Sequence, residues 1–534
     1  MSTGLLALLA VVPILLALIL MVGFRFPSTR AMPLAFLTAA VMAVAVWQMP
    51  INHVLALFVE GTVTAIGVLI IVFGAILIYY TLQSSGAMET IQAGMTKVSP
   101  DSRVQAIIVG YMFGAFIEGA AGFGTPAALA APLLLGLGFP PICAAVICLV
   151  FNSFPVTFGA VGTPVIAGFQ SLAVPAGLAD KQALFHAIGQ NVTLMHGAMI
   201  FILPIFMLGF MTRFYGKNKS WAEGFAAWKY CIMAGILFAI PYYIIAWLAG
   251  PEVPSLVGGL IGLAALISLT KKGVCVPKEV WSFAPNSEWK SNWTGAIAAS
   301  DVTEYKEHMS QFMAWLPYIL CGLILVVTRV QGFGLKALMF KNPATTFNLP
   351  QFAEGINLSA SIDLLWLPGT IPFILVSLLT ILLHKMNGQK VAEAWSTTCQ
   401  KMVAPTIALV AAVSLVSIFK GSAQNALGYP SMPLAMATVC ADALGNVWPA
   451  VASYIGGLGA FITGSNTVSD MLFANFQWDV AQQLHFNVKQ SIAVIAAQGA
   501  GGAMGNMICV HNIVAACAVT GLIGREGDIL KQTV

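Results

Sequence analysis

The chain carries one carboxyl group at the edge of a long apolar segment that is rich in helix-breaking residues. Glu118 is followed by 61 residues without a single Asp, Glu, Lys or Arg, and this stretch holds nine glycines and seven prolines. Burial in such a setting favours the neutral form of a carboxyl group, which can then take up and release a proton near neutral pH. We therefore predict that Glu118 carries a coupled proton, with a purely structural carboxylate as the alternative.

The residues after Glu118 predict a re-entrant or discontinuous helix. Glycines recur through Gly-Ala-Ala-Gly-Phe-Gly-Thr-Pro over 119–126, and a Thr before a Pro is typical of a helix start. A helix that begins there offers unpaired N–H groups and a partial positive charge, which suit a carboxylate. We therefore expect Gly122, Gly124 and Thr125 to bind a small organic anion.

A second break is predicted where polar residues and prolines return to the apolar sequence. Asn152 lies 34 residues after Glu118, and Thr163 lies in Gly-Thr-Pro over 162–164. Proline frees backbone carbonyl groups here, while the amide and hydroxyl side chains could bind a hydroxyl group of the substrate. The alternative is a proline kink whose freed backbone is capped by the same side chains. Asn152 and Thr163 are thus candidates for the substrate site.

The second half of the chain holds a counterpart to these breaks. Thr-Gly-Ser-Asn-Thr-Val-Ser-Asp occupies 463–470, and Asn506 follows Gly464 after 42 residues. Four glycines between Gly499 and Gly505 permit close backbone approach and positive φ. They lack the strand and lysine of a nucleotide-binding loop. Three polar residues at the first of these breaks are predicted to bind the substrate: Ser465, Asn466 and Thr467.

Ionisable groups at membrane depth are costly, so each of them is a candidate functional residue. Asp470 is a second carboxyl group for proton coupling. His511 could relay a proton, because it titrates near neutral pH, or simply donate to a neighbouring carbonyl group. Lys420 ends a predicted span, where its ammonium group would reach the membrane surface or attract an anionic substrate. Asp442 is expected to cap the segment that follows it.

The composition is that of a polytopic membrane protein. Of 534 residues, 59% are hydrophobic and 8% are charged, whereas a soluble protein carries about 25% charged residues. The net charge of +4 indicates no nucleic-acid partner, because most Lys and Arg residues fall in loops on one predicted side. The chain lacks phosphate-binding, zinc-protease and serine-nucleophile motifs. We therefore expect no ATP-driven pump, no enzyme, no cofactor and no metal.

Nine stretches are apolar and long enough to cross a membrane, at about 20 residues per crossing. They are 4–22, 31–47, 62–81, 186–210, 230–249, 254–270, 314–330, 362–383 and 402–420. The first is expected to be a retained helix, because no basic segment or cleavage site accompanies it. Two further apolar regions, 104–175 and 432–523, are interrupted by polar and glycine-rich clusters. The distribution of Lys and Arg among the loops places the N-terminus outside.

The order of these elements predicts an internal repeat. Two spans precede the Glu118 cluster, two spans precede the Ser-Asn-Thr cluster, and the charge rule gives the two halves opposite orientations. Inverted repeats with broken helices are typical of secondary transporters, although chance spacing is an alternative. The predicted division is an N-terminal transmembrane helix at 1–30, a first inverted repeat at 31–210, connecting helices and loops at 211–361, and a second inverted repeat at 362–534.

At these residues the chain resembles the L-lactate permease family of bacteria. The resemblance covers nearly the whole chain, and the Glu118 motif is its most specific part. It rests on Gly114-Ala-Phe-Ile-Glu-Gly-Ala-Ala-Gly-Phe-Gly124, Gly136-Leu-Gly-Phe139, Phe158-Gly-Ala-Val-Gly-Thr-Pro-Val165, Phe461-Ile-Thr-Gly-Ser-Asn-Thr467 and Ala515-Ala-Cys-Ala-Val-Thr-Gly-Leu-Ile-Gly-Arg-Glu526.

The resemblance implies import of L-lactate, glycolate or related 2-hydroxy monocarboxylates by proton symport across the bacterial inner membrane. The expected partners are this carboxylate, protons and membrane lipid, with a homodimer left open. The family is grouped with a wider ion-transporter superfamily, which implies re-entrant hairpins and an elevator-like fold. In that superfamily, Ser-Asn-Thr motifs contact carboxylates or sodium, which supports residues 465–467 and makes Thr125 their first-half counterpart.

Two departures from the family pattern alter the expectations. The pattern continues past Arg525 with one more apolar span, so the chain is expected to be shorter by one C-terminal helix. Asn466 stands where some relatives carry Asp, which shifts the proton-coupling role toward Glu118 or Asp470.

The sequence therefore predicts an α-helical secondary transporter, with two rival functions. A sodium-coupled dicarboxylate transporter would use the neutral oxygen ligands of the Ser-Asn-Thr cluster for a hard cation. An anion channel would use the same polar breaks but would conduct without uphill accumulation.

Overall fold

The computed structural model describes residues 1–24, 26–122, 125–291, 293–294, 305–330, 334–358, 360–367, 369–522 and 525–534. Within these ranges the regular secondary structure is helical apart from one antiparallel ribbon, in which β1 (Thr346–Asn348) pairs with β2 (Ser361–Asp363). Among the described residues, nine helices are long and apolar enough to span a membrane, and one bent helix pair would make a tenth. The predicted class, an all-α polytopic membrane protein, is confirmed.

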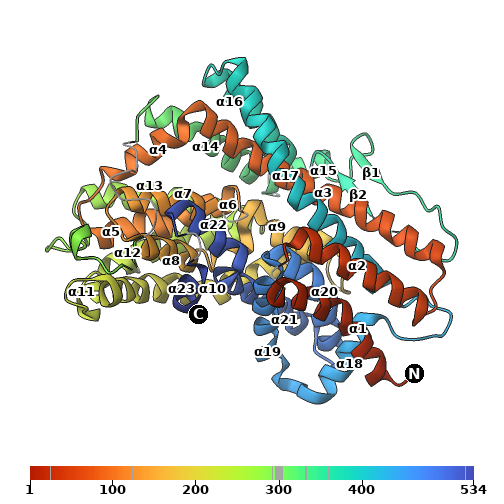
Figure 1. The fold of residues 1–534 in the computed structure, drawn as a ribbon. Coiled ribbons are helices and arrows are strands. Elements are labelled where there is room, and N and C mark those ends of the chain that lie inside the picture. Colours follow the sequence, from red (N-terminus) through yellow and green to blue (C-terminus); the bar gives the residue numbers. More distant parts are fainter. Residues whose placement is uncertain are drawn as a thin grey trace.

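A group of helices that we call the frame forms one side of the molecule (Figure 1). Its long members α3 and α17 pack along each other, because glycine allows their backbones to approach: a Cβ atom on Gly61 would lie 2.4 Å from the Cα atom of Ser414. The frame comprises α1 (Thr3–Leu18), α2 (Ser28–Ala45), α3 (Ile51–Ser85), α4 (Ala87–Thr96), α14 (Gln311–Arg329), α15 (Leu335–Met339), α16 (Val376–Leu383) and α17 (Gly388–Gly421).

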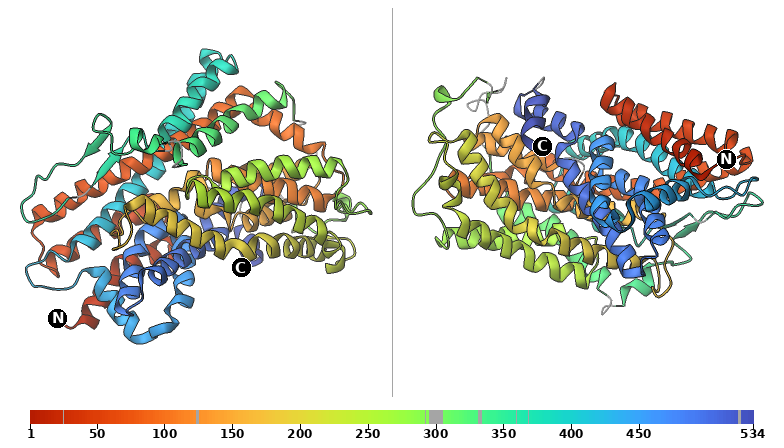
Figure 2. Two further views of the ribbon diagram at one scale, coloured as in Figure 1. Left: turned by 180° about the vertical axis from the view of Figure 1, so that it is seen from behind. Right: turned by 90° about the horizontal axis from the view of Figure 1, so that it is seen from below.

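The remaining helices form a second group, the core, which packs against the frame through α9, α18 and α20 (Figure 2). Its first part comprises α5 (Ser102–Gln105), a π-helical segment (Ala106–Phe113), α6 (Gly114–Ala120), α7 (Thr125–Gly136), α8 (Pro141–Phe151), α9 (Gly159–Gly168), α10 (Lys181–Tyr215), α11 (Trp221–Phe225), α12 (Trp228–Leu248) and α13 (Pro254–Lys271). Its second part comprises α18 (Met432–Leu444), α19 (Trp448–Thr463), α20 (Asn466–Gln483), α21 (Val488–Gly505), α22 (Val510–Thr520) and α23 (Glu526–Thr533).

Both regions predicted to be interrupted are broken helices. In the first, α6 and α7 form a hairpin, and the α8–α9 pair is bent by 61° at the Asn152 break. In the second, α19 and α20 form a hairpin, and a short 3₁₀ turn at Asn506–Ile508 separates α21 from α22. The same order of hairpin, helix, break and helix thus recurs in both halves.

The close backbone contact predicted for the glycines of 499–505 occurs between α19 and α21. A Cβ atom on Gly501 would lie 1.9 Å from the carbonyl oxygen of Ser453, and one on Gly505 would lie 2.1 Å from that of Gly457. Positive φ, which the sequence also permitted, is not used between Gly499 and Gly505. These glycines therefore serve close helix packing.

One predicted span starts later than expected. Residues 361–363, at the start of predicted span 362–383, form strand β2, where Asp363 accepts hydrogen bonds from Lys341 N–H and from the Thr346 hydroxyl. The helical run begins only at Gly369, with a π-helical segment that ends at Leu375. The polar residues Ser361 and Asp363 thus pair with β1 instead of starting the apolar helix.

Candidate functional site

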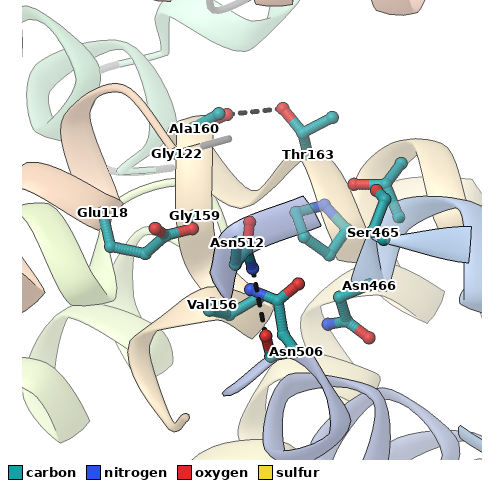
Figure 3. Close-up of a pocket in the computed structure, with 13 residues that line it drawn as sticks. Glu118, Gly122, Val156, Gly159, Ala160, Thr163, Ser465, Asn466, Asn506 and Asn512 are labelled. Carbon is teal, nitrogen blue, oxygen red and sulfur yellow. Dashed lines mark hydrogen bonds between the residues drawn. The ribbon is translucent and has the colours of Figure 1, made fainter. Parts of the chain in front are cut away.

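The breaks of both halves meet at one cavity in the core (Figure 3). The cavity leaves about 350 Å³ free of atoms, part of it open to solvent. It brings together six of the residues predicted from the sequence: Glu118, Gly122, Thr163, Ser465, Asn466 and Thr467. Residues separated by more than 300 positions therefore share one site, which the sequence spacing alone could not establish.

Glu118 supplies the carboxyl group of this cavity. Its side chain, on the last turns of α6, is only 3% exposed. The amide of Asn152 lies beside the carboxyl group, whereas Oε2 has no hydrogen-bond partner in the described part of the chain. Gly159 makes room for the group, since a Cβ atom there would lie 2.2 Å from Oε1. A buried carboxyl with one unpaired oxygen is costly to ionise.

A left-handed turn at the start of α9 forms the wall of the cavity that faces the α6–α7 hairpin. Ala160, Val161 and Gly162 have φ values of 40°, 58° and 71°. A left-handed conformation costs a non-glycine residue about 1–2 kcal/mol, and a β-branched valine is especially unsuited to it. The turn also lies against Gly122, where a Cβ atom would be 2.9 Å from the backbone nitrogen of Ala160. Such strain is typical of functional sites.

Two Gly-Thr-Pro sequences start helices near the cavity in the same way. The Thr125 hydroxyl donates to the carbonyl oxygen of Gly122 at 2.6 Å, and α7 begins at Thr125 as predicted. The Thr163 hydroxyl donates to the carbonyl oxygen of Ala160, and right-handed helix resumes after Gly162. Thr163 lines the cavity, but Thr125 does not.

The second hairpin contributes the N-terminus of α20. Gly464 takes φ of 76° at the tip, and the hydroxyl of Ser465 caps the helix by accepting from Val468 N–H. Asn466 donates from Nδ2 to the carbonyl oxygen of Gly499 at 3.3 Å, while its Oδ1 has no partner among the described residues. The cavity therefore receives the free N–H groups of a helix start, whereas the amide oxygen of Asn466 lies against Gly502 of α21.

The third helix start at the cavity is that of α22. Asn512 donates from Nδ2 to the carbonyl oxygen of Asn506 at 3.0 Å, and both residues line the cavity. The hydrogen bond links the two sides of the break between α21 and α22 and holds the side chain of Asn512 in place.

Besides Thr125, four predicted residues lie elsewhere or cannot be placed. Asn152 is behind Glu118 rather than at the cavity surface. Asp470 is fully buried one turn along α20 from Asn466, and its Oδ1 accepts from Gln498 at 3.3 Å. Gly124 and the side chain of His511 lie outside the described residues.

Seven lining residues were absent from the predicted site: Val156, Gly159, Ala160, Pro164, Gly464, Asn506 and Asn512. Several of them stand in the same motifs as predicted residues, such as Phe158-Gly-Ala-Val-Gly-Thr-Pro-Val165. Gly159 and Ala160 contribute to the site through the conformation of their backbone. A search for reactive or polar side chains could not find them. Asn506 and Asn512 could have been found as the only amide side chains at the last break, over 499–512.

The described lining residues present neutral donors and acceptors, helix N-termini and one carboxyl group, without a Lys or Arg side chain. Three helix starts, at Thr163, Asn466 and Val510, converge there. This arrangement suits a small anion with a hydroxyl group, provided that the carboxyl group of Glu118 is neutral when the anion is bound.

Comparison with known proteins agrees with this site chemistry. A family model described as L-lactate permease matches residues 6–534. A "Putative L-lactate permease" of Haemophilus influenzae is 31% identical, covering 98% of this chain and 94% of the relative. The L-lactate permease of Escherichia coli is 28% identical, covering 99% and 92%, and the glycolate permease of the same organism is 27% identical, covering 99% and 93%. The chain therefore belongs to the L-lactate permease family.

Proposed function

We propose that this protein imports L-lactate, together with glycolate or related 2-hydroxy monocarboxylates, by proton symport across the bacterial inner membrane. Relatives named L-lactate and glycolate permeases support the substrate class. The observation that supports coupling of transport to protons is the composition of the cavity. Among its described lining residues, one buried carboxyl group, that of Glu118, lies among neutral donors and three helix starts. The names of these relatives give no support to a sodium-coupled dicarboxylate transporter.

The substrate carboxylate fits the helix starts at Thr163 and Asn466. Their free N–H groups and partial positive charges stabilise an anion without a cationic side chain. The 2-hydroxyl group of the substrate would bind to the neutral amide and hydroxyl side chains that line the same cavity. A substrate lacking this hydroxyl would leave such a buried polar group unpaired, which costs about 1–3 kcal/mol.

Proton coupling follows from the repulsion between two carboxylates in one buried cavity. Ionised Glu118 would disfavour a bound anion, whereas neutral Glu118 can donate a hydrogen bond to it. Binding of the proton and binding of the anion therefore strengthen each other reciprocally. The loaded cavity then holds one net negative charge, that of the substrate, instead of two. Asp470, buried one turn away, is the second candidate for the proton.

We further propose that the recurring order of elements reflects two inverted repeats, at 31–210 and 362–534. The hairpin α6–α7 would correspond to α19–α20, and the α8–α9 break to the α21–α22 break. Their opposite orientation, which rests on the charge distribution of the loops, would let both hairpin tips reach one cavity from the two sides of the membrane.

The direct test is uptake of labelled L-lactate into proteoliposomes that contain the purified protein. An inside-alkaline pH gradient of one unit is expected to drive about tenfold accumulation for a one-to-one symport. A sodium gradient without a pH gradient should drive none. Glycolate should compete with lactate, and succinate should not. Accumulation that follows sodium, or flux without accumulation above the external concentration, would contradict the proposal and favour the dicarboxylate or channel alternatives.

Gly502→Ala is expected to weaken lactate binding by displacing Asn466. A Cβ atom on Gly502 would lie 1.8 Å from Oδ1 of Asn466, so this side chain must move away from α21 and lose its present position in the site. The half-saturating lactate concentration should rise about tenfold, the effect of losing one hydrogen bond within a site. Gly322→Ala is the matched control, because nothing lies within 4 Å of a Cβ atom there. An unchanged half-saturating concentration in Gly502→Ala would exclude Asn466 from the site.

A further inference from the structure

A second cavity lies between the frame and the core, beside the central one. It is lined by α3 and α17 of the frame and by the ends of α9 and α20 of the core, which are neighbours in Figure 1. It leaves about 620 Å³ free of atoms, part of it open to solvent. We call it the Lys420 cavity after the lysine at the end of α17 that lines it.

The chemistry of the Lys420 cavity is unusually polar for a space between apolar helices. Its lining includes the Lys420 ammonium group, the Glu60 carboxyl group, the Gln170 amide and the hydroxyls of Ser171 and Ser417. An ammonium group close to hydroxyl and amide groups matches a carboxylate that carries a neighbouring hydroxyl group.

A second ammonium group lies close to this cavity. Lys181 donates from Nζ to the carbonyl oxygens of Gln170 and Leu172, and its charge interacts electrostatically with that of Lys420. Lys420 is exposed and Lys181 is partly exposed, and the two ammonium groups repel each other. A substrate anion beside them would add to the compensation that the Glu60 carboxylate of the same cavity gives. Attraction of Lys420 to the C-terminal end of α17 is the rival explanation for its position.

The Lys420 cavity is separated from the central cavity by a thin wall. Ala167 lies four residues beyond Thr163 on α9, and Met471 lies five residues beyond Asn466 on α20, which is about 6 Å and about 7.5 Å along the helix axes. Between them α9 and α20 touch, since a Cβ atom on Gly168 would lie 2.5 Å from the Cβ atom of Asp470. Because Gly168 has no side chain, α9 and α20 can lie close together here, and the two cavities are separated only by this contact.

We propose that the Lys420 cavity is a vestibular binding site on the outer side, which holds the 2-hydroxy monocarboxylate before it passes the Gly168–Asp470 contact. This inference rests on the proposed function. Lys420 binds the carboxylate of the substrate, and Ser417 and Gln170 bind its hydroxyl group. The negative charge of Glu60 lowers the affinity of the cavity for the anion, so that the anion can leave toward the central cavity.

Lys420→Gln tests the role of the ammonium group in transport. The half-saturating lactate concentration should rise about tenfold for entry from the outer side, as expected for one lost hydrogen bond to a charged group, with an unchanged maximal rate. Entry from the inner side, measured in vesicles of opposite orientation, should keep its half-saturating concentration. Lys420→Arg should restore outer binding, and Lys489→Gln, an exposed lysine at the start of α21, should change neither value. Equal effects from both sides, or none, would overturn the proposal.

Ser417→Cys gives a readout that does not depend on transport. Labelling of this cysteine by a membrane-impermeant thiol reagent should slow about tenfold when lactate is present at ten times its dissociation constant. The exposed Cys275 and Cys399 lie on the predicted cytoplasmic side and are not reached. Adding Lys420→Gln should abolish the protection. Labelling that ignores lactate would reject the vestibular site, whereas failure of the wild-type protein to accumulate lactate would reject only the proposed function.

Discussion

Replacing Glu118 with glutamine is expected to abolish accumulation of lactate driven by a pH gradient and to leave lactate exchange intact. Glutamine resembles the neutral carboxyl group in size and cannot lose a proton, so the cavity stays in the form that binds the anion. Without a coupled proton the ratio of internal to external lactate should fall to about one, because an uncoupled carrier only equilibrates its substrate. Counterflow of labelled lactate in proteoliposomes measures exchange, and net uptake measures accumulation.

The pH dependence of exchange gives the same test a second readout. Exchange by the wild-type protein should fall as pH rises, because ionised Glu118 repels the anion, whereas exchange by the glutamine variant should not depend on pH. Glu393→Gln, which removes an exposed carboxyl group of α17, is the control and should behave as wild type. If Glu118→Gln still accumulates lactate and Asp470→Asn does not, the coupled proton resides on Asp470.

Gly159→Ala should abolish both accumulation and exchange. The new Cβ atom would lie 2.2 Å from Oε1 of Glu118, so the carboxyl group must move into the cavity or the break must shift. Overpacking of this kind costs about 1–3 kcal/mol. The backbone at Gly159 has φ −66° and ψ 154°, which alanine also adopts, so the clash alone separates the two residues.

Stability measurements separate this effect from misfolding. Thermal unfolding of the purified variant, with Gly322→Ala as control, reports the folding cost, and lactate exchange reports the site. We expect a folded protein without exchange. A Gly159→Ala protein that exchanges lactate at the wild-type rate would show that the position of the Glu118 carboxyl group is not critical.

The helix breaks were predictable from the sequence because their causes are local. Thr125 before a proline predicted the start of α7, and Ser465 before Asn466 and Thr467 marked the second hairpin tip. A single proline is tolerated within a span, as Pro13 is in α1, but clusters of glycine, proline and polar residues in a charge-free segment indicate where the backbone turns inside the protein.

The left-handed turn at Ala160–Gly162 could not be predicted, because neither Ala160 nor Val161 favours positive φ. The surrounding packing imposes it: a Cβ atom on Gly162 would lie 2.3 Å from the carbonyl oxygen of Pro251. Likewise, no pattern in the sequence indicated that Asp470 would lie behind the cavity wall while Asn466, four residues earlier, lines it. The orientation of α20 against α9 decides which face of that helix meets the substrate.

By itself, the sequence determined the membrane setting, the helical class, the positions of the breaks and the membership of the family, since hydrophobicity, breakers and motifs act over short stretches of chain. Only the tertiary structure decided that two hairpin tips and two broken helices, more than 300 residues apart, enclose one cavity around Glu118. The physical reason is that such a cavity depends on which backbones can approach. Close contacts such as those at Gly159, Gly168 and Gly502 are set by pairs of segments that no single stretch of sequence contains.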